Sequence, residues 1–337
     1  MSIKMEELKL KQSWLGQKNI LSHLVPEINQ VEELLYQTIG TDQGTIGEMC
    51  TYLLESGGKR LRPMLIILSG KALSPHYQKE LIAAGAAAEL IHMASLVHDD
   101  IIDQSLYRRG RLTIHSLWGE KNAVLTGDFL FAKAFDLLVS YQLFKVLKLM
   151  VEAIQEMCRG EIIQSENLFS TNQDTNDYFQ RIEQKTGKLL AACCQSGAII
   201  TGADASIETA LKNYGTYLGY TYQIVDDLLD FSGSEETLGK PICQDLIQGN
   251  LTLPVLYLLN HPTEGAWVRQ IIDNKDLNPA NCTAIMNLVH QTGLLTESQK
   301  VAAECGERAK NQLVKIPAGI NRTLLEEVID KALRRTS

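Results

Sequence analysis

Long stretches that combine Ala, Leu and Ile with Glu and Lys dominate this chain, and they constrain its fold more than any other feature. Residues 78–102, 123–149 and 177–200 are the clearest of these stretches. Their composition and apolar spacing are typical of helices, whereas stretches with the alternating period of strands are scarce. Turn-forming residues such as Gly57 and Gly58 separate the helical stretches. The sequence therefore predicts an all-α bundle of roughly ten or more helices, given the usual helix length.

The chain is predicted to form one domain. Its 337 residues are enough for a large core, and length alone would allow two domains. No linker rich in Pro, Gly or Ser divides the sequence, and no abrupt change of composition does so. No repeat of regular period is seen, which argues against a solenoid. We therefore expect a single domain over residues 1–337, with its core at about 30–330.

Charge and cysteine content narrow the function classes. The formal net charge of −8 argues against general nucleic-acid binding. The seven cysteines form no C-x-x-C pair and no zinc-type spacing with His, so we expect reduced thiols in a cytoplasmic protein. The first residues, M-S-I-K-M-E-E-L-K-L-K, lack the apolar core of a signal peptide. No membrane span is expected, whereas peripheral membrane contact for product release stays open.

Two clusters of aspartate stand out inside apolar helical stretches. Within each cluster the first and last aspartates are four residues apart, so they share one face of a helix. Like charges this close repel one another, and Asp is a poor residue for a helix interior, so a compensating ligand is expected. Carboxylates suit Mg²⁺, which commonly binds one or two of them together with a ligand phosphate. The clusters are D-D-I-I-D, with Asp99, Asp100 and Asp103, and D-D-L-L-D, with Asp226, Asp227 and Asp230.

Basic groups accompany these clusters. The planar fork of Arg and the point charge of Lys both suit phosphate. Acidic clusters for magnesium together with basic clusters for phosphate indicate a site that handles two diphosphates by different means. The basic groups are Lys59, Arg60 and Arg62 in S-G-G-K-R-L-R-P, Arg108, Arg109 and Arg111 in Y-R-R-G-R-L-T, and Lys240 in G-K-P.

Six motifs occur in a specific order along the chain. They are G-G-K-R-L-R-P, E-L-I-H-M-A-S-L-V-H-D-D-I-I-D-Q-S-L-Y-R-R-G, T-G-D-F-L, Q-K-T-G-K-L-L, Y-Q-I-V-D-D-L-L-D and L-G-K-P-I-C-Q-D-L-I-Q-G-N-L-T-L-P. With them the chain resembles the trans-prenyltransferases, or isoprenyl diphosphate synthases (the polyprenyl synthetase family), over at least Leu53 to Leu259. It is most similar to the bacterial medium- and long-chain polyprenyl synthases, especially the catalytic component of the heptaprenyl type. The resemblance implies an isoprenoid synthase-type helical bundle with a central reaction cavity.

The resemblance also implies an activity. An allylic diphosphate such as farnesyl diphosphate would be elongated with isopentenyl diphosphate units, by magnesium-assisted ionisation and trans 1′-4 condensation. About three Mg²⁺ ions per active site would assist. The product would be a medium- or long-chain polyprenyl diphosphate, heptaprenyl-like, that serves as a quinone side-chain precursor. The family implies a homodimer, or a heteromer with a small dissimilar subunit.

Roles for single residues follow from the resemblance, motif by motif. The metal ligands are Asp99, Asp100, Asp103, Asp226, Asp227 and Asp230. Isopentenyl diphosphate is bound by Lys59, Arg62, His92 and Arg109. The allylic diphosphate is bound by Arg108, Lys185, Thr186, Gln223 and Lys240. Three of these, Lys185, Thr186 and Gln223, also act in catalysis by offering charge and dipoles near the allylic cation.

The spacing of one helical stripe supports the role of His92. His92, Ser95, Asp99 and Asp103 follow one another at intervals of three or four residues, which places them on one face of a helix. A single His in an apolar helix is usually a core residue, but this spacing and the motif match favour a side chain that faces the same cavity as the metal ligands.

Small residues near the first cluster bear on product length. Ala94 and Ser95 stand where short-chain synthases of this family carry a bulky aromatic residue, so the resemblance implies room for a growing apolar chain. The segment G-D-F-L-F-A-K-A-F supplies the next candidates for the floor of the tunnel, namely Phe129, Leu130 and Phe131.

Two departures from the family pattern and three alternatives remain. Cys243 stands where the family often has glycine, and Asn250 where it often has lysine. A geranylgeranyl diphosphate synthase is the alternative for product length. A terpene cyclase would lack the second acidic cluster and the basic set Lys59, Arg62 and His92. A non-catalytic regulatory subunit would be expected to lose acidic ligands, and both clusters are intact here.

Overall fold

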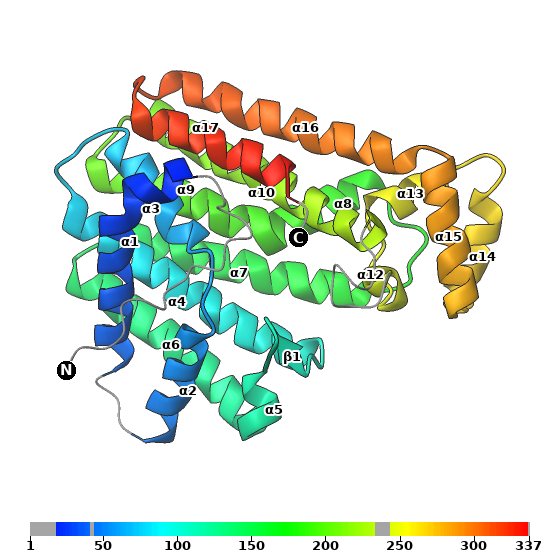
Figure 1. Ribbon diagram of the computed structural model, residues 1–337, viewed down its shortest axis with the longest axis horizontal. Helices are drawn as coiled ribbons and strands as arrows, with labels where there is room; N and C mark the ends of the chain where they lie inside the picture. The colour runs from blue at the N-terminus through cyan, green and yellow to red at the C-terminus, as the bar shows by residue number, and fades with distance from the viewer. Residues whose placement is uncertain (1–17, 41–43, 233–242, 336–337) are drawn as a thin grey trace. The chain divides into compact units, whose positions relative to one another are not determined.

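The computed structural model describes residues 18–40, 44–232 and 243–335, with side chains from His23 onward apart from that of residue 232. Helices make up most of this part of the chain (Figure 1), which confirms the all-α prediction. They are α1 Lys18–Ile39, α2 Thr45–Glu55, α3 Leu61–Lys71, α4 Gln78–Ile102, α5 Ile114–Trp118, α6 Glu120–Ser140, α7 Phe144–Glu166, α8 Thr175–Ile182, the π-helix η1 Glu183–Gly187, α9 Lys188–Thr201, α10 Ala205–Ser232, α12 Gln244–Ile247, α13 Leu253–Leu259, α14 Gly265–Asp273, α15 Pro279–Gln291, α16 Leu294–Gln312, the 3₁₀ helix η2 Leu313–Lys315 and α17 Ile320–Leu333.

These helices gather into two compact units, each assembled from several segments of the chain. The first unit comprises residues 1–150, 193–208 and 316–325, and the second comprises residues 151–192, 209–315 and 326–337. The expectation of a single domain stays a prediction.

Helix α4 is the core helix of the first unit, where it packs against α1, α3 and α6 (Figure 1). A run of buried small residues, 83–88, lets these neighbours approach closely. On α6, Gly127 lies so near α4 that an added Cβ would be 2.1 Å from Nε2 of His98. By length and composition α4 could also cross a membrane, but 78% of its apolar window is buried inside the protein. That burial is typical of a core helix.

A short hairpin follows α4 and carries two of the predicted arginines. Strands β1 Tyr107–Arg108 and β2 Arg111–Leu112 pair in antiparallel fashion, with Arg108 opposite Arg111. Arg109 and Gly110 form the turn and both have positive φ, 53° and 74°. A two-residue hairpin turn of the I′ type needs this conformation at both positions. The turn therefore fixes the backbone of Arg109, a predicted ligand of isopentenyl diphosphate.

The core of the second unit contains residues from α8, α10, α13, α15 and α16. Helix α8 begins with a capping box, in which the Asp174 carboxylate accepts from two backbone N–H groups and Asp177 bonds back to the Asp174 amide. Tyr178 on α8 and Phe231 on α10 are among the largest fully buried side chains. Helix α8 thus places a phenol in the core next to the helix that carries the second acidic cluster.

Candidate functional site

The first acidic cluster lies at the C-terminal end of α4, and its stripe is the less buried face of that helix. His92, Ser95 and Asp99 are half-buried and Asp103 is exposed, whereas Ala94 between them is fully buried. These side chains are thus less buried than Ala94; that His92 faces the same cavity as the metal ligands stays a prediction. Whether they bind diphosphate and metal stays a prediction.

Asp100 differs from the two aspartates beside it. It is buried, and its Oδ1 accepts a hydrogen bond of 2.7 Å from Nε of Arg108 on the hairpin. Burial raises the pKa of the Asp100 carboxyl, and the charge of Arg108 opposes that rise. Asp100 therefore anchors the hairpin to the end of α4. Its carboxylate is occupied by Arg108, whereas Asp99 and Asp103 are the aspartates of this cluster predicted to bind the metal directly.

Two of the basic residues predicted for isopentenyl diphosphate, Arg62 and Arg109, lie close enough to His92 for their charges to act on it. Burial lowers the pKa of His92 well below its usual range, and the charges of Arg62, Arg109 and Arg108 lower it further. His92 is therefore neutral at neutral pH. Nε of Arg62 is buried and has no hydrogen-bond partner among the described residues. A buried donor without an acceptor is costly, and an anionic ligand would satisfy it.

In the second unit, four side chains form a continuous line of hydrogen bonds. The Thr186 hydroxyl donates to Oε1 of Gln223 over 2.8 Å, and Nε2 of Gln223 donates to Oδ1 of Asp227 over 2.8 Å. The Tyr178 hydroxyl donates to Oδ2 of Asp227 over 2.7 Å. Burial raises the pKa of Asp227, and these bonds oppose the rise. Both oxygens of Asp227 are thus engaged with the chain, and Gln223 is held in a single orientation.

Two predicted catalytic residues sit in the π-helix η1. Lys185 and Thr186 lie within Glu183–Gly187, where the helix widens by one residue. Such single π turns are frequent at functional sites. Helix α10 passes close by, because a Cβ on Gly219 would be only 2.6 Å from the Cα of Gly187. Nζ of Lys185 lies 3.3 Å from Oε2 of Glu161 on α7.

The outer aspartates of the second cluster have different partners. Asp230 accepts from the backbone N–H groups of Gln244 at 3.0 Å and Asp245 at 3.1 Å, so it stabilises the start of α12. Oδ1 of Asp226 lies 2.7 Å from Nη1 of Arg335, which makes an ion pair between α10 and the end of the chain's described part. Arg335 also lies over the Tyr222 ring, 4.8 Å from its centroid.

Several residues near these side chains were not found from the sequence. A cavity of about 60 Å³ in the second unit is lined by Lys185, Gln223 and Asp227 together with Asp245, Asn250 and Thr252. Burial raises the pKa of Asp245, and the carboxylates of Asp227, Asp230 and Asp226 raise it further. Oδ1 of Asn250 and Oγ1 of Thr252 are buried without a hydrogen-bond partner among the described residues. Asp245 could have been found from the sequence, because it is the aspartate of the family motif L-G-K-P-I-C-Q-D-L.

Cys243, the other departure from the family pattern besides Asn250, can also be placed. Cys243 has a φ of 60°, a left-handed conformation that favours glycine, and its side chain is fully buried. A cysteine there keeps the backbone geometry of a glycine position while filling core space. Lys240, the predicted contact of the allylic diphosphate, lies outside the described residues.

The predicted chain-length residues lie on α4 and α6, which pack together. Ala94 and Leu130 are fully buried. Ser95 and Phe129 are half-buried; the Ser95 hydroxyl donates to a carbonyl one turn earlier over 2.9 Å. Nζ of Lys133 lies 5.2 Å from the centroid of the Phe129 ring. Of the small residues, Ser95 alone lies on the half-buried stripe, whereas Ala94 is part of the core.

Among residues 18–40, 44–232 and 243–335, no three or more His, Cys, Asp or Glu side chains are gathered so as to hold a metal ion. The donors that the two clusters offer are nevertheless carboxylate oxygens, the type that hard divalent cations prefer. The described chain therefore supplies carboxylates of the right chemistry, and further ligands would have to come from a bound molecule or from water.

Comparison with known proteins shows extensive similarity. The family model for polyprenyl synthetase matches residues 43–289. Heptaprenyl diphosphate synthase component 2 of Geobacillus stearothermophilus is 37% identical over 311 residues, which cover 92% of this chain and 96% of that protein.

Two crystal structures share the fold. Heptaprenyl diphosphate synthase from Staphylococcus aureus is 33% identical, with a TM-score of 0.87 over 93% of this chain and 99% of that one. A polyprenyl synthase from Caulobacter crescentus CB15, complexed with calcium and isoprenyl diphosphate, is 32% identical, with a TM-score of 0.88 over 94% of this chain and 97% of that one. The isoprenoid synthase-type bundle expected from the motifs is thereby confirmed.

Proposed function

Because the chain belongs to the polyprenyl synthetase family, we propose that it elongates an allylic diphosphate with isopentenyl diphosphate to a polyprenyl diphosphate of medium or long chain. It is a trans-prenyltransferase. The observation that carries the proposal is that a heptaprenyl diphosphate synthase component matches 92% of the chain while both acidic clusters are intact on α4 and α10. The heptaprenyl product and its use as a quinone side-chain precursor are the finer parts of the proposal.

Divalent metal fits the residues that are present. Asp99 and Asp103 stand on the less buried face of α4, and the side chain of Asp226 is 44% exposed. Mg²⁺ binds one or two carboxylates and completes its shell with phosphate oxygens and water. We assign Asp99, Asp103 and Asp226 as its ligands, about three ions per site, with Asp100, Asp227 and Asp230 in support. Bound Mg²⁺ would supply electrostatic stabilisation of the leaving diphosphate.

Isopentenyl diphosphate would meet a preformed set of donors in the first unit. The buried N–H of Arg62 needs an acceptor, and a phosphate oxygen provides one. Burial, together with the charges of the neighbouring arginines, lowers the pKa of His92 and keeps the imidazole neutral, so it can donate a hydrogen bond without adding a titrating charge. Lys59 and Arg109 complete the set by their motif positions.

The allylic side of the reaction depends on electrostatics rather than on a nucleophile. As the allylic C–O bond breaks, positive charge develops on the prenyl carbon, and oriented dipoles stabilise it. The Thr186 and Gln223 side chains form a fixed hydrogen-bonded pair, so they offer oriented dipoles. Lys185 supplies a cation for the diphosphate, together with Arg108 and Lys240. The isopentenyl double bond attacks the cation, and the condensed product then gives up a proton to the departing diphosphate, which leaves with the electron pair of the broken C–O bond.

Product length and assembly are further parts of the proposal. Ser95 and Phe129 would border the growing chain, with Ala94 and Leu130 behind them in the core. The relative from G. stearothermophilus is named a component, which supports a small dissimilar partner subunit; a homodimer is the other assembly. We place the protein in the cytoplasm, with peripheral membrane contact when the product leaves.

The test is a product assay with the purified chain. Radiolabelled isopentenyl diphosphate and farnesyl diphosphate are supplied with Mg²⁺, first to the chain alone and then with its neighbour-encoded candidate partner. Products longer than twenty carbons support the proposal, and products that stop at twenty identify the geranylgeranyl alternative. Activity only with the partner indicates the two-component assembly.

Two control reactions address the other classes. A hydrocarbon formed from geranylgeranyl diphosphate alone would identify a terpene cyclase. The Asp99→Ala variant should abolish condensation, and unchanged activity in that variant would indicate that catalysis belongs to another chain.

A further inference from the structure

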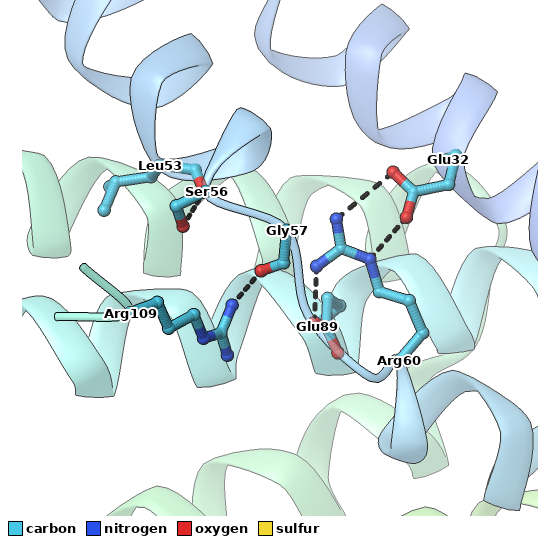
Figure 2. A network of polar contacts seen from close by, with 7 residues as sticks. All are labelled: Glu32, Leu53, Ser56, Gly57, Arg60, Glu89 and Arg109. Atoms are coloured by element: carbon cyan, nitrogen blue, oxygen red, sulfur yellow. Dashed lines mark hydrogen bonds and ion pairs between the residues drawn. The ribbon is translucent and has the colours of Figure 1, made fainter. Parts of the chain in front are cut away.

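The loop Gly57–Arg60 is tied to three separate elements of the first unit, as Figure 2 shows. Arg60 contacts Glu32 on α1 and Glu89 on α4. From the hairpin, Nη1 of Arg109 donates to the carbonyl oxygen of Gly57. The loop is short, but α1, α4 and the hairpin all hold it in place.

Arg60 makes these contacts from an unusual backbone conformation. Its φ of 47° and ψ of 36° are left-handed, directly before the first residue of α3. A residue with a side chain adopts this conformation at a cost, which other contacts must offset. Here Nε and Nη2 donate to the two carboxylate oxygens of Glu32, and Nη1 donates to Oε1 of Glu89 over 2.8 Å. The planar fork of Arg is thereby matched to two carboxylates at once.

The guanidinium of Arg60 is poorly placed to bind substrate itself. The side chain is only 5% exposed, and that of Glu89 is 4% exposed. Burial alone would lower the pKa of Arg60, but Glu89 and Glu32 raise it instead. Its charge is therefore permanent and is directed to the two carboxylates.

The residues next to Arg60 are those that the family motif assigns to isopentenyl diphosphate. Lys59 precedes it and Arg62 follows two residues later. Gly58 lies against both guanidinium groups, since an added Cβ would be 3.0 Å from Nη1 of Arg60 and 3.1 Å from Nη1 of Arg109. Glu89 stands three residues before His92 on α4, so the anchor and His92 occupy neighbouring turns.

We propose that Arg60, held by Glu32 and Glu89, is a positioning residue for isopentenyl diphosphate: it fixes the Gly57–Arg60 loop so that Lys59 and Arg62 meet the diphosphate beside His92 and Arg109. This inference rests on the proposed function. It identifies the residues that hold the binding site for isopentenyl diphosphate in place. It predicts a selective defect, because the residues that flank Arg60 in the chain, Lys59 and Arg62, are those assigned to isopentenyl diphosphate.

A buried ion-pair network that served only folding would behave differently. Weakening it would lower the melting temperature and reduce activity towards both substrates alike. A positioning network would raise KM for isopentenyl diphosphate while KM for the allylic substrate and kcat change little, because kcat is measured with both substrates saturating.

The decisive variant is Arg60→Lys, which keeps the charge but cannot bridge two carboxylates with a planar fork. We expect KM for isopentenyl diphosphate to rise about tenfold or more, with KM for farnesyl diphosphate and kcat within about twofold. Calorimetric titration of isopentenyl diphosphate should show the same loss of affinity. The matched control is Arg159→Lys, whose side chain is 62% exposed and which should leave every constant unchanged.

Glu89→Gln provides a second measurement if Arg60→Lys does not fold. It keeps an acceptor for Arg60 but removes the charge, so a smaller rise in the same KM is expected. An unchanged KM for isopentenyl diphosphate in both variants, or equal changes for both substrates, would overturn the inference. Failure of the proposed function is distinguishable, because the unaltered protein would then incorporate no labelled isopentenyl diphosphate under any condition.

Discussion

The buried Tyr178 hydroxyl donates a 2.7 Å hydrogen bond to Oδ2 of Asp227 and thereby joins α8 to the second acidic cluster. Tyr178 is fully buried and Asp227 is 6% exposed. Neither group therefore has ready access to water as a substitute partner. This bond carries the first prediction.

Replacing Tyr178 with Phe should destabilise the protein. The variant leaves a buried carboxyl oxygen without its donor, which costs about 1–3 kcal/mol. Chemical unfolding would measure the loss. Tyr77→Phe is the control, because Tyr77 is 37% exposed and should tolerate the change. Equal stability of the two variants would mean that water replaces the phenol.

Replacing Arg335 with Ala should strengthen cation binding. Its guanidinium pairs with Asp226, a proposed metal ligand, so a cation must compete with it. Because Asp226 is partly exposed, the gain should not exceed about 1 kcal/mol, or about fivefold in affinity. Titration with Mn²⁺ in the absence of substrate would measure it. Lys310→Ala removes a different pair, with Asp330, and should leave the affinity unchanged; weaker binding in Arg335→Ala would refute the competition.

Asp245 should contribute less to the stability of the folded state as pH rises above about 4. Burial and the nearby carboxylates raise the folded-state pKa of Asp245 above its unfolded value near 4. Between those two values the folded state binds more protons than the unfolded state, so the free energy of unfolding decreases with rising pH. Asp245→Asn should therefore raise the melting temperature more at pH 8 than at pH 5, in metal-free buffer. Asp136→Asn, at an exposed site, is the control and should show no such difference.

The two small residues near the first cluster should respond differently to enlargement. Ser95 is half-buried, so Ser95→Phe should fold and shorten the product, whereas Ser95→Ala adds no bulk and should not. Ala94 is fully buried, so Ala94→Phe should overpack the core and cost about 1–3 kcal/mol of stability. Product sizing and thermal unfolding of the three variants would check this. Long products from Ser95→Phe would place the growing chain elsewhere.

The sequence was most informative about features that repeat locally. Helical spacing predicted the all-α fold, which is confirmed, and a stripe from His92 to Asp103 that faces one cavity, which stays a prediction. The ordered motifs predicted the family, and the comparisons confirm it. They also confirm the predicted activity, that of a prenyltransferase with a medium- or long-chain product. The roles of single residues, the single domain and the cytoplasmic location stay predictions.

Contacts between distant residues could not be read from such patterns. Tyr178 and Asp227 are 49 positions apart, and nothing in the spacing of either segment links them. Arg60 looked like one more phosphate ligand in a basic motif, because its left-handed backbone and its two carboxylate partners depend on how α1 and α4 pack. Asp245 is one aspartate in a motif, and the sequence alone does not show that it is buried beside other carboxylates that raise its pKa.

The widened turn at Glu183–Gly187 makes this part of the chain sensitive to insertions and deletions as well as to substitutions. A π turn holds one residue more than an α turn over the same rise. Deleting one residue there would let an unbroken α-helix form in which the flanking turns keep their register, because the π turn absorbs the extra residue, while the residues inside the turn would point in new directions. Thr186 would then no longer reach Gln223, although every other residue of the motif remained. The number of residues in this turn is therefore part of the site, just as their identities are.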